Sequence, residues 1–191
     1  RGHGRSGGMR ARVPTQDQLL ADLDAMIQLI RSKYAPDRVY LLGESMGGLV
    51  AINYAARRPI NLNGLILVAP AVRIACVQLF KAENLKVLPA LLFQRDRPII
   101  DLAGQRLEDA TVDQDFMLAR RTDALAINKI SVDYLLGLSR LQTALTRNAA
   151  AIHVPTLVLH GKRDKILSWK GSESLQHDLG SVDKKLVTFE E

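Results

Sequence analysis

The pentapeptide Gly43-Glu44-Ser45-Met46-Gly47 constrains the fold of this chain more than any other feature, because of what flanks it. A short β-rich run at 38–42 precedes it, and a helical run rich in small residues follows as far as residue 57. Glycines at both ends of the pattern G-x-S-x-G leave room for a serine on a strained turn. The sequence therefore predicts a buried strand, a sharp turn with Ser45 at its tip, and a helix.

The other regular elements alternate between helices and apolar strands. The spacing of apolar residues predicts an amphipathic helix over 16–34, introduced by a capping box of Thr15 and Gln18. Three further apolar runs are typical of strands, at 62–69, 154–160 and 184–189. This alternation predicts an α/β fold with a mostly parallel sheet covered by helices on both faces.

A long segment between Pro70 and His153 is predicted to be an inserted helical cap, because it far exceeds a usual strand–helix connection. We expect the core to comprise 1–70 and 153–191, and the cap 71–152. Within the cap, leucines recur at helical spacing over 131–148. A chain of 191 residues is otherwise the length of one ordinary domain.

Composition excludes several classes of function. The net charge is +6, but basic and acidic residues are interleaved, which favours an ordinary solvated surface. The basic start lacks aromatic residues, so contact with an anionic membrane surface fits better than a nucleic acid. The single cysteine, Cys76, allows no intramolecular disulfide and no cysteine-based zinc site. No apolar run is long enough to span a bilayer, and no nucleotide or metal motif occurs, so no cofactor is expected.

The strand–turn–helix context makes Ser45 a candidate nucleophile. A serine hydroxyl needs a neighbouring base, an acid that orients the base, and donors for the developing oxyanion. The backbone amide of Met46, at the predicted helix start, is placed to be one such donor. Asp164, just after the strand at 154–160, is the candidate acid, and a turn aspartate that caps the next helix is the alternative.

The histidines do not supply an evident base. His177 is the only one that follows Asp164, and it falls inside a predicted helix over 169–179 that would carry it away from Ser45. His3, His153 and His160 are expected to be structural.

Several blocks of the sequence resemble a known group of proteins. They span 2–8, 42–49, 65–70, 123–125 and 154–164. Together they resemble the α/β-hydrolase superfamily and, within it, the monoacylglycerol lipase and lysophospholipase-like branch, which is often labelled serine aminopeptidase S33-like. The resemblance implies that Ser45 is the nucleophile, that Asp164 orients the catalytic histidine, and that the Met46 amide lines the oxyanion hole.

Two elements of that family have no counterpart in the sequence. The His-Gly segment that supplies a second oxyanion donor normally precedes the glycine-rich loop, and the catalytic histidine normally follows the last strand. We therefore expect a fragment that is inactive alone and that exposes a sheet edge, with its base beyond Glu191.

The function implied is hydrolysis of a carboxylic ester, such as a monoacylglycerol or lysophospholipid, through an acyl-serine intermediate. Leu88, Leu91, Leu92 and Phe93 could line an acyl pocket or touch a membrane, although a buried cap core is the commoner role. A peptidase, acyltransferase or cofactor-free peroxidase on the same scaffold is an alternative, and so is a non-catalytic binding protein. A cytoplasmic or membrane-peripheral location is favoured.

Overall fold

The computed structural model describes residues 1–12, 15–58, 62–73, 95–98, 100–101, 109 and 111–190. The chain divides into two compact units, each built from two stretches of sequence. The first unit comprises Arg1–Pro14 and Cys76–Ser139, and the second comprises Thr15–Ala75 and Arg140–Glu191. The predicted division into core and cap at residues 70 and 152 stays a prediction.

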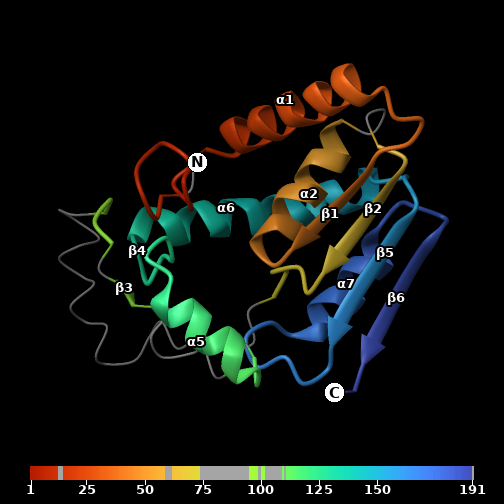
Figure 1. Cartoon of the computed structure of the whole chain (residues 1–191). Helices are drawn as coiled ribbons and strands as arrows, with labels where there is room; N and C mark the ends of the chain where they lie inside the picture. The colour runs from red at the N-terminus through yellow and green to blue at the C-terminus, as the bar shows by residue number, and fades with distance from the viewer. Residues whose placement is uncertain are drawn as a thin grey trace. The chain divides into compact units, whose positions relative to one another are not determined.

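The second unit is built on a four-stranded parallel sheet (Figure 1). Its strands are β1 (Tyr40–Glu44), β2 (Gly64–Val68), β5 (Thr156–Gly161) and β6 (Lys184–Phe189), in the order β1-β2-β5-β6. Every neighbouring pair is parallel, so all four carboxyl ends lie at the same edge of the sheet. The prediction of an α/β fold with a mostly parallel sheet is confirmed.

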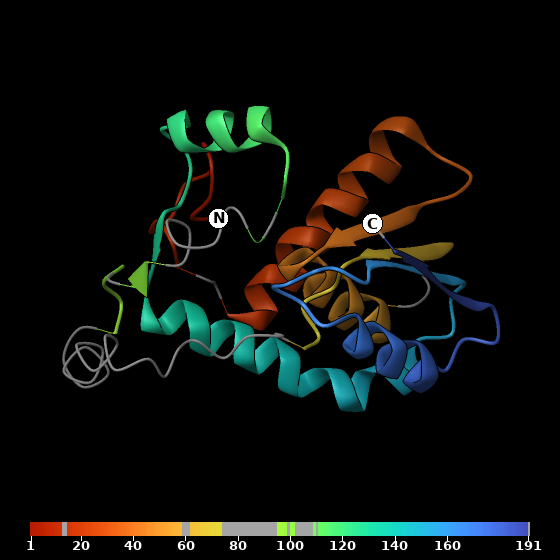
Figure 2. The same cartoon turned by 90° about the horizontal axis from the view of Figure 1, so that it is seen from below.

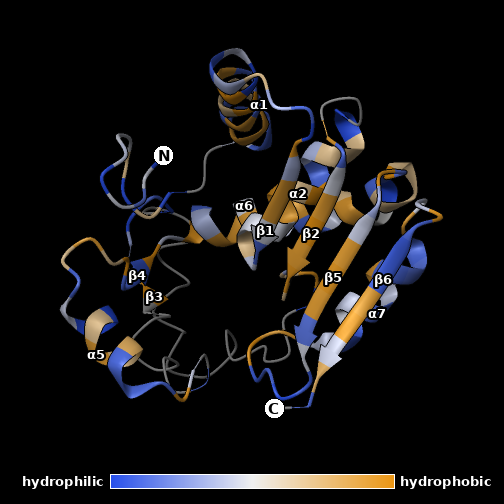
Figure 3. Ribbon diagram, turned by 45° about the vertical axis from the view of Figure 1, so that its right-hand side comes forward, coloured by the Kyte–Doolittle hydropathy of each residue, from blue (hydrophilic) through white to orange (hydrophobic). Residues whose placement is uncertain are grey.

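Helices α2 (Met46–Arg57) and α7 (Trp169–Asp178) cover one face of this sheet. Figures 2 and 3 show both helices on the same side of the strands. Helix α1 (Gln16–Tyr34) has the predicted bounds and the predicted capping box, and it contacts α2. Among the strand residues that point toward α2 and α7, Leu65, Leu67 and Val158 are fully buried.

The opposite face of the sheet is more open than the sequence predicts. Gly43 faces α2, so by strand alternation Tyr40 and Leu42 point the other way, and they are 54% and 60% exposed. In the described residues β1 pairs with β2 alone. The prediction of a buried strand at 38–42 is wrong, because an apolar run does not reveal how many neighbours a strand has.

The first unit contains helix α5 (Gln114–Thr122), the start of α6 (Val132–Asn148) and a short antiparallel pair, β3 (Ile100–Asp101) with β4 (Lys129–Ile130). Its small core joins Ile100, Ile130 and Val132. The two-residue strands were not predicted, since they are too short to show a period of two. The apolar run with Leu88, Leu91, Leu92 and Phe93 lies outside the described residues.

Two negative findings hold for the part of the chain that the structure describes. No helix there combines the length and the apolar character needed to cross a membrane. No group of three or more His, Cys, Asp or Glu side chains there is arranged to hold a metal ion.

Candidate active site

The turn between β1 and α2 holds Ser45 in a strained backbone conformation. Its φ is +50° and its ψ is −117°, a region that non-glycine residues avoid at a cost of about 1–3 kcal/mol. Three backbone hydrogen bonds fix this conformation. The Ser45 N–H donates to Val68 O at 3.0 Å, and the Ser45 carbonyl accepts from the N–H groups of Gly48 at 3.1 Å and Ala71 at 3.0 Å.

The tightness of this turn explains why the first glycine of the motif, Gly43, cannot be replaced by a larger residue without a clash. A Cβ at Gly43 would lie 2.6 Å from the carbonyl oxygen of Gly47, closer than real Cβ contacts. A Cβ at Gly47 would instead meet nothing within 4 Å. The second position at which sterics demand glycine is Gly48, whose Cβ would lie 2.8 Å from the Cβ of Pro70.

The Ser45 side chain is exposed and makes no capping hydrogen bond to α2, although Ser45 occupies the N-cap position. Met46 is the first residue of that helix. A helix N-terminus concentrates N–H groups and positive dipole charge, and it therefore stabilises a negative charge close by. An oxyanion that developed on a group attacked by Ser45 would lie at this helix end.

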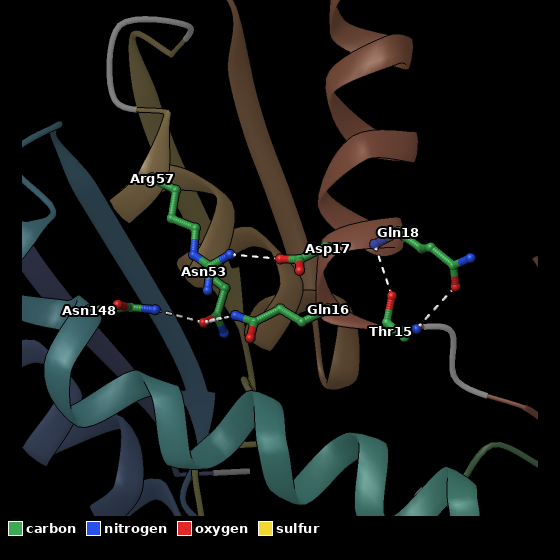
Figure 4. A network of polar contacts seen from close by, with 7 residues as sticks. All are labelled: Thr15, Gln16, Asp17, Gln18, Asn53, Arg57 and Asn148. Carbon is green, nitrogen blue, oxygen red and sulfur yellow. Dashed lines mark hydrogen bonds and ion pairs between the residues drawn. The ribbon is translucent and has the colours of Figure 1, made fainter.

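Helix α2 is anchored by a buried polar network, which Figure 4 shows. The fully buried Asn53 side chain makes four hydrogen bonds. Its amide nitrogen donates to Leu49 O and Leu141 O, and its oxygen accepts from Gln16 at 2.7 Å and Asn148 at 2.8 Å. Because every donor and acceptor of the amide is used, the network fixes α2 against α1 and α6 within the second unit.

The loop after β5 places Asp164 at the same sheet edge as Ser45. Its Oδ1 accepts hydrogen bonds from the N–H groups of Ile166 and Leu167, both at 2.8 Å. Helix α7 has Ser168, not Asp164, at its N-cap position. Asp164 thus stabilises its own turn, in line with part of the alternative weighed from sequence, but it does not cap the next helix.

His160 supports this loop from beneath. Its side chain is fully buried, and its Nε2 lies 3.2 Å from Leu167 O and 3.5 Å from Asp164 Oδ2. Since a carbonyl only accepts, Nε2 carries a proton, and Nδ1 forms a hydrogen bond of 2.7 Å with the Ser172 hydroxyl, which it accepts when the ring is neutral. Sequence reasoning missed this role; the signal was a histidine at an inward-pointing position of β5 and a serine on the buried face of α7.

The environment lowers the pKa of the Asp164 carboxyl. Partial burial acts in the opposite direction and would raise this pKa. The hydrogen bonds from His160, Leu167 and Ile166 favour the charged form and outweigh the burial. Asp164 is therefore ionised at neutral pH, as a group that orients a histidine must be.

Ser45 and Asp164 follow β1 and β5, which are separated by β2 alone. Two strand spacings amount to about 10 Å, a gap that an intervening imidazole can bridge. All four histidines of the chain are described, and none of them hydrogen-bonds to Ser45. Their ring nitrogens instead contact Arg1 O in His3, Gly180 O in His153, Asp178 in His177, and the partners given above in His160.

Comparison with known protein families matches residues 1–191, the whole chain, to the family described as "Serine aminopeptidase, S33". The chain belongs to this family. The membership agrees with the resemblance found in the sequence blocks and with the parallel sheet of the second unit.

Similar curated proteins include a monoglyceride lipase from Rattus norvegicus, 30% identical over 99% of this chain and 62% of its own length. A monoacylglycerol lipase from Mycolicibacterium smegmatis is 26% identical over 99% of this chain and 66% of its own length. The chain therefore spans somewhat less than two thirds of the length of these relatives.

Solved structures show the same fold. A monoacylglycerol lipase from Paleococcus ferrophilus superposes with a TM-score of 0.75 at 23% identity, covering 98% of this chain and 70% of the other. A soluble variant of monoglyceride lipase from Saccharomyces cerevisiae, in complex with a substrate analogue, gives a TM-score of 0.78 at 22% identity, covering 99% and 65%. The α/β-hydrolase fold predicted from the sequence is confirmed.

Proposed function

We propose that the complete gene product is a serine hydrolase that cleaves the carboxylic ester of a lipid, of the monoacylglycerol or lysophospholipid class. The observation that carries this proposal is the exposed, strained Ser45 between β1 and α2. Relatives named monoglyceride lipase support the substrate class, as does a 28% identical phospholipase from Bacillus subtilis.

In the proposed mechanism the Ser45 hydroxyl attacks the ester carbonyl while a histidine takes its proton. The Met46 amide stabilises the oxyanion, and Asp164 holds the imidazole and stabilises the imidazolium that forms. The histidine then returns the proton to the leaving alcohol, and water cleaves the acyl-Ser45 ester by the same steps in reverse order.

The proposed cap, 71–152, would give the acyl chain an apolar site. Its apolar segment with Leu88, Leu91, Leu92 and Phe93 lies outside the described residues, so the support for this part is the length and composition of the segment alone. Peripheral contact with an anionic membrane surface is proposed on the net charge of +6 and the lipid class of the relatives.

Covalent labelling with a fluorophosphonate, followed by mass spectrometry of the modified peptide, tests the nucleophile. We expect the complete gene product to be labelled at Ser45 and the Ser45→Ala variant to be unlabelled. Ser168→Ala is the matched control, because Ser168 is also an N-cap serine without a side-chain capping bond but has an ordinary φ of −77°. Absence of labelling at Ser45 in the complete gene product would reject the proposal and favour a non-catalytic binding protein.

The same labelling experiment also tests where the catalytic base lies. Labelling of the complete gene product but not of residues 1–191 alone would agree with the expectation of a histidine beyond Glu191. Equal labelling of both would show that residues 1–191 suffice to activate Ser45.

A second candidate activity is peptide hydrolysis, which the description of the family favours. Both activities use the same nucleophile and differ in the leaving group. Turnover of p-nitrophenyl octanoate without turnover of aminoacyl p-nitroanilides supports the ester hydrolase, and the reverse pattern supports the peptidase.

A further inference from the structure

The first unit contains a pocket of about 420 Å³ whose lining includes neither Ser45 nor Asp164. This volume is within the range of about 300–1,000 Å³ that small-molecule sites occupy. Polar side chains of His3, Arg120 and Tyr134 line part of it. Aliphatic side chains of Leu125, Ile127 and Ile130 line another part, together with the small residues Gly4 and Ala126.

Arg120 presents a guanidinium group whose orientation is already fixed. One of its terminal nitrogens donates to Asn128 Oδ1 at 3.0 Å, and the other donates to Ile127 O at 2.9 Å. These bonds use two of the five N–H donors of the group. The remaining donors sit on a group that needs little reordering to bind a carboxylate or phosphate.

Tyr134 and His3 form the second polar wall. Their rings contact one another with centroids 6.1 Å apart, and the Tyr134 N–H donates to Ser131 Oγ at 3.1 Å. Burial raises the pKa of the Tyr134 phenol, so its hydroxyl keeps its proton at neutral pH. His3 Nδ1 donates to Arg1 O, which leaves Nε2 as the ring nitrogen for other partners.

The two walls are tied together by Arg10. Its guanidinium donates to Gly4 O at 2.9 Å and to Leu125 O at 2.5 Å, and both of these residues line the pocket. Figure 1 shows the N-terminal loop beside β4 and the start of α6.

Among the described residues that line the pocket there is no carboxylate. The nearby Asp123 is occupied in its own loop, where its Oδ1 accepts from the N–H of Leu125 at 2.8 Å. The Arg120 guanidinium therefore lies beside an aliphatic wall, with no carboxylate among the described residues of the lining.

We propose that this pocket binds an amphiphile in which an anionic oxygen group, a carboxylate or a phosphate, is attached to a short aliphatic chain. Arg120 and Tyr134 hold the anionic group, and the aliphatic side chains hold the chain. This binding requires neither Ser45 nor Asp164, so it stands or falls independently of the proposed hydrolysis.

The test is a titration of the ¹⁵N-labelled protein with octanoate, octyl phosphate, octanol and inorganic phosphate, followed through the backbone amide signals of 125–127. We expect saturable shifts with octanoate and octyl phosphate, and affinities for octanol and inorganic phosphate at least about tenfold weaker. The ratio between octanoate and octyl phosphate identifies which anion is preferred. Octanol binding as tightly as both anions, or inorganic phosphate binding as tightly as octyl phosphate, would overturn the proposal.

Variants on one helix separate the pocket from general charge. Arg120→Gln is expected to weaken octanoate binding about tenfold or more, whereas the matched Arg121→Gln, which removes the same charge outside the lining, changes it by less than about twofold. Equal losses of octanoate affinity in both variants would show that the effect comes from general surface charge, and would reject the site.

Because Arg120 also bonds to its own loop, a second variant keeps the test independent of folding. Tyr134→Phe preserves the ring and removes only the phenol hydroxyl. It is expected to weaken octanoate binding about threefold to tenfold while the amide signals of the unliganded protein stay in place. Unchanged affinity in Tyr134→Phe would remove the second polar wall from the proposal and overturn it.

Discussion

Two turns at the carboxyl edge of one sheet are held in place by different means. The turn at Ser45 is held by backbone packing, since Gly43 lies against the Gly47 carbonyl and three main-chain hydrogen bonds fix the strained residue. The turn at Asp164 is held by side chains, since its carboxylate accepts two amides and rests on His160. Substitutions that add atoms should therefore damage the first turn, and substitutions that remove polar atoms should damage the second.

The largest effect is expected for Gly43→Ala. The new Cβ would lie 2.6 Å from Gly47 O, so the backbone of the turn must move. We expect a loss of about 3 kcal/mol in the free energy of unfolding, measured by urea denaturation and circular dichroism. A loss below about 0.5 kcal/mol would mean that backbone packing does not hold this turn.

Removal of His160 should cost nearly as much. His160→Ala leaves a cavity and deprives the buried Ser172 hydroxyl and the Leu167 carbonyl of their partner, so we expect a loss of about 2–3 kcal/mol in the same measurement. His177→Ala is the matched control, because His177 is 88% exposed, and it should change stability by less than about 0.5 kcal/mol. Equal effects of the two substitutions would contradict the supporting role of His160.

Asp164→Asn should have a smaller effect that depends on pH. The folded-state pKa of Asp164 is lowered, so its ionised form adds stability above the unfolded-state value of about 3.9, and this stability is lost as the pH falls through the lower folded-state pKa. At neutral pH we expect the variant to lose about 1 kcal/mol. Urea midpoints measured from pH 6 downward should converge for the two proteins in acid, and a constant difference across that range would exclude the carboxylate as the cause.

Gly47→Ala is expected to have the smallest effect and sharpens the comparison most. A Cβ there meets nothing within 4 Å, and alanine has the higher helix propensity, so the change in unfolding free energy should stay within about 1 kcal/mol and favour stability. If this substitution destabilises the protein as strongly as Gly43→Ala, the turn is constrained by something other than contact at Gly43.

The turn held by backbone packing was easier to predict from the sequence than the turn held by side chains. The turn at Ser45 is encoded by neighbours in sequence, and the positions of β1, Ser45 and α2 were predicted to within two residues. Asp164 was placed after its strand, but its support was missed, because Ser172 lies 12 residues from His160 and joins it only through the packing of α7 on the sheet. Local sequence patterns predict structure that neighbouring residues determine. Contacts between residues that tertiary packing brings together are harder to predict from the sequence.

The same reason explains the errors about exposure. The run at 38–42 has the β-rich character of a strand, yet Tyr40 and Leu42 are exposed, since β1 has one sheet neighbour in the described residues. Strand identity was readable from composition, but strand order was not, because parallel neighbours are distant in sequence.

The network around Asn53 has a consequence for how this sequence can change over generations. Gln16, Asn53 and Asn148 come from three different helices and share one buried amide. A substitution at Asn53 deprives Gln16 and Asn148 of this partner, and a substitution at Gln16 or Asn148 leaves the buried Asn53 oxygen with one hydrogen bond instead of two. Selection penalises such a loss even when the new side chain fits. Lineages that alter one of these positions should therefore alter the others as well. We expect the three positions to covary in otherwise diverging sequences.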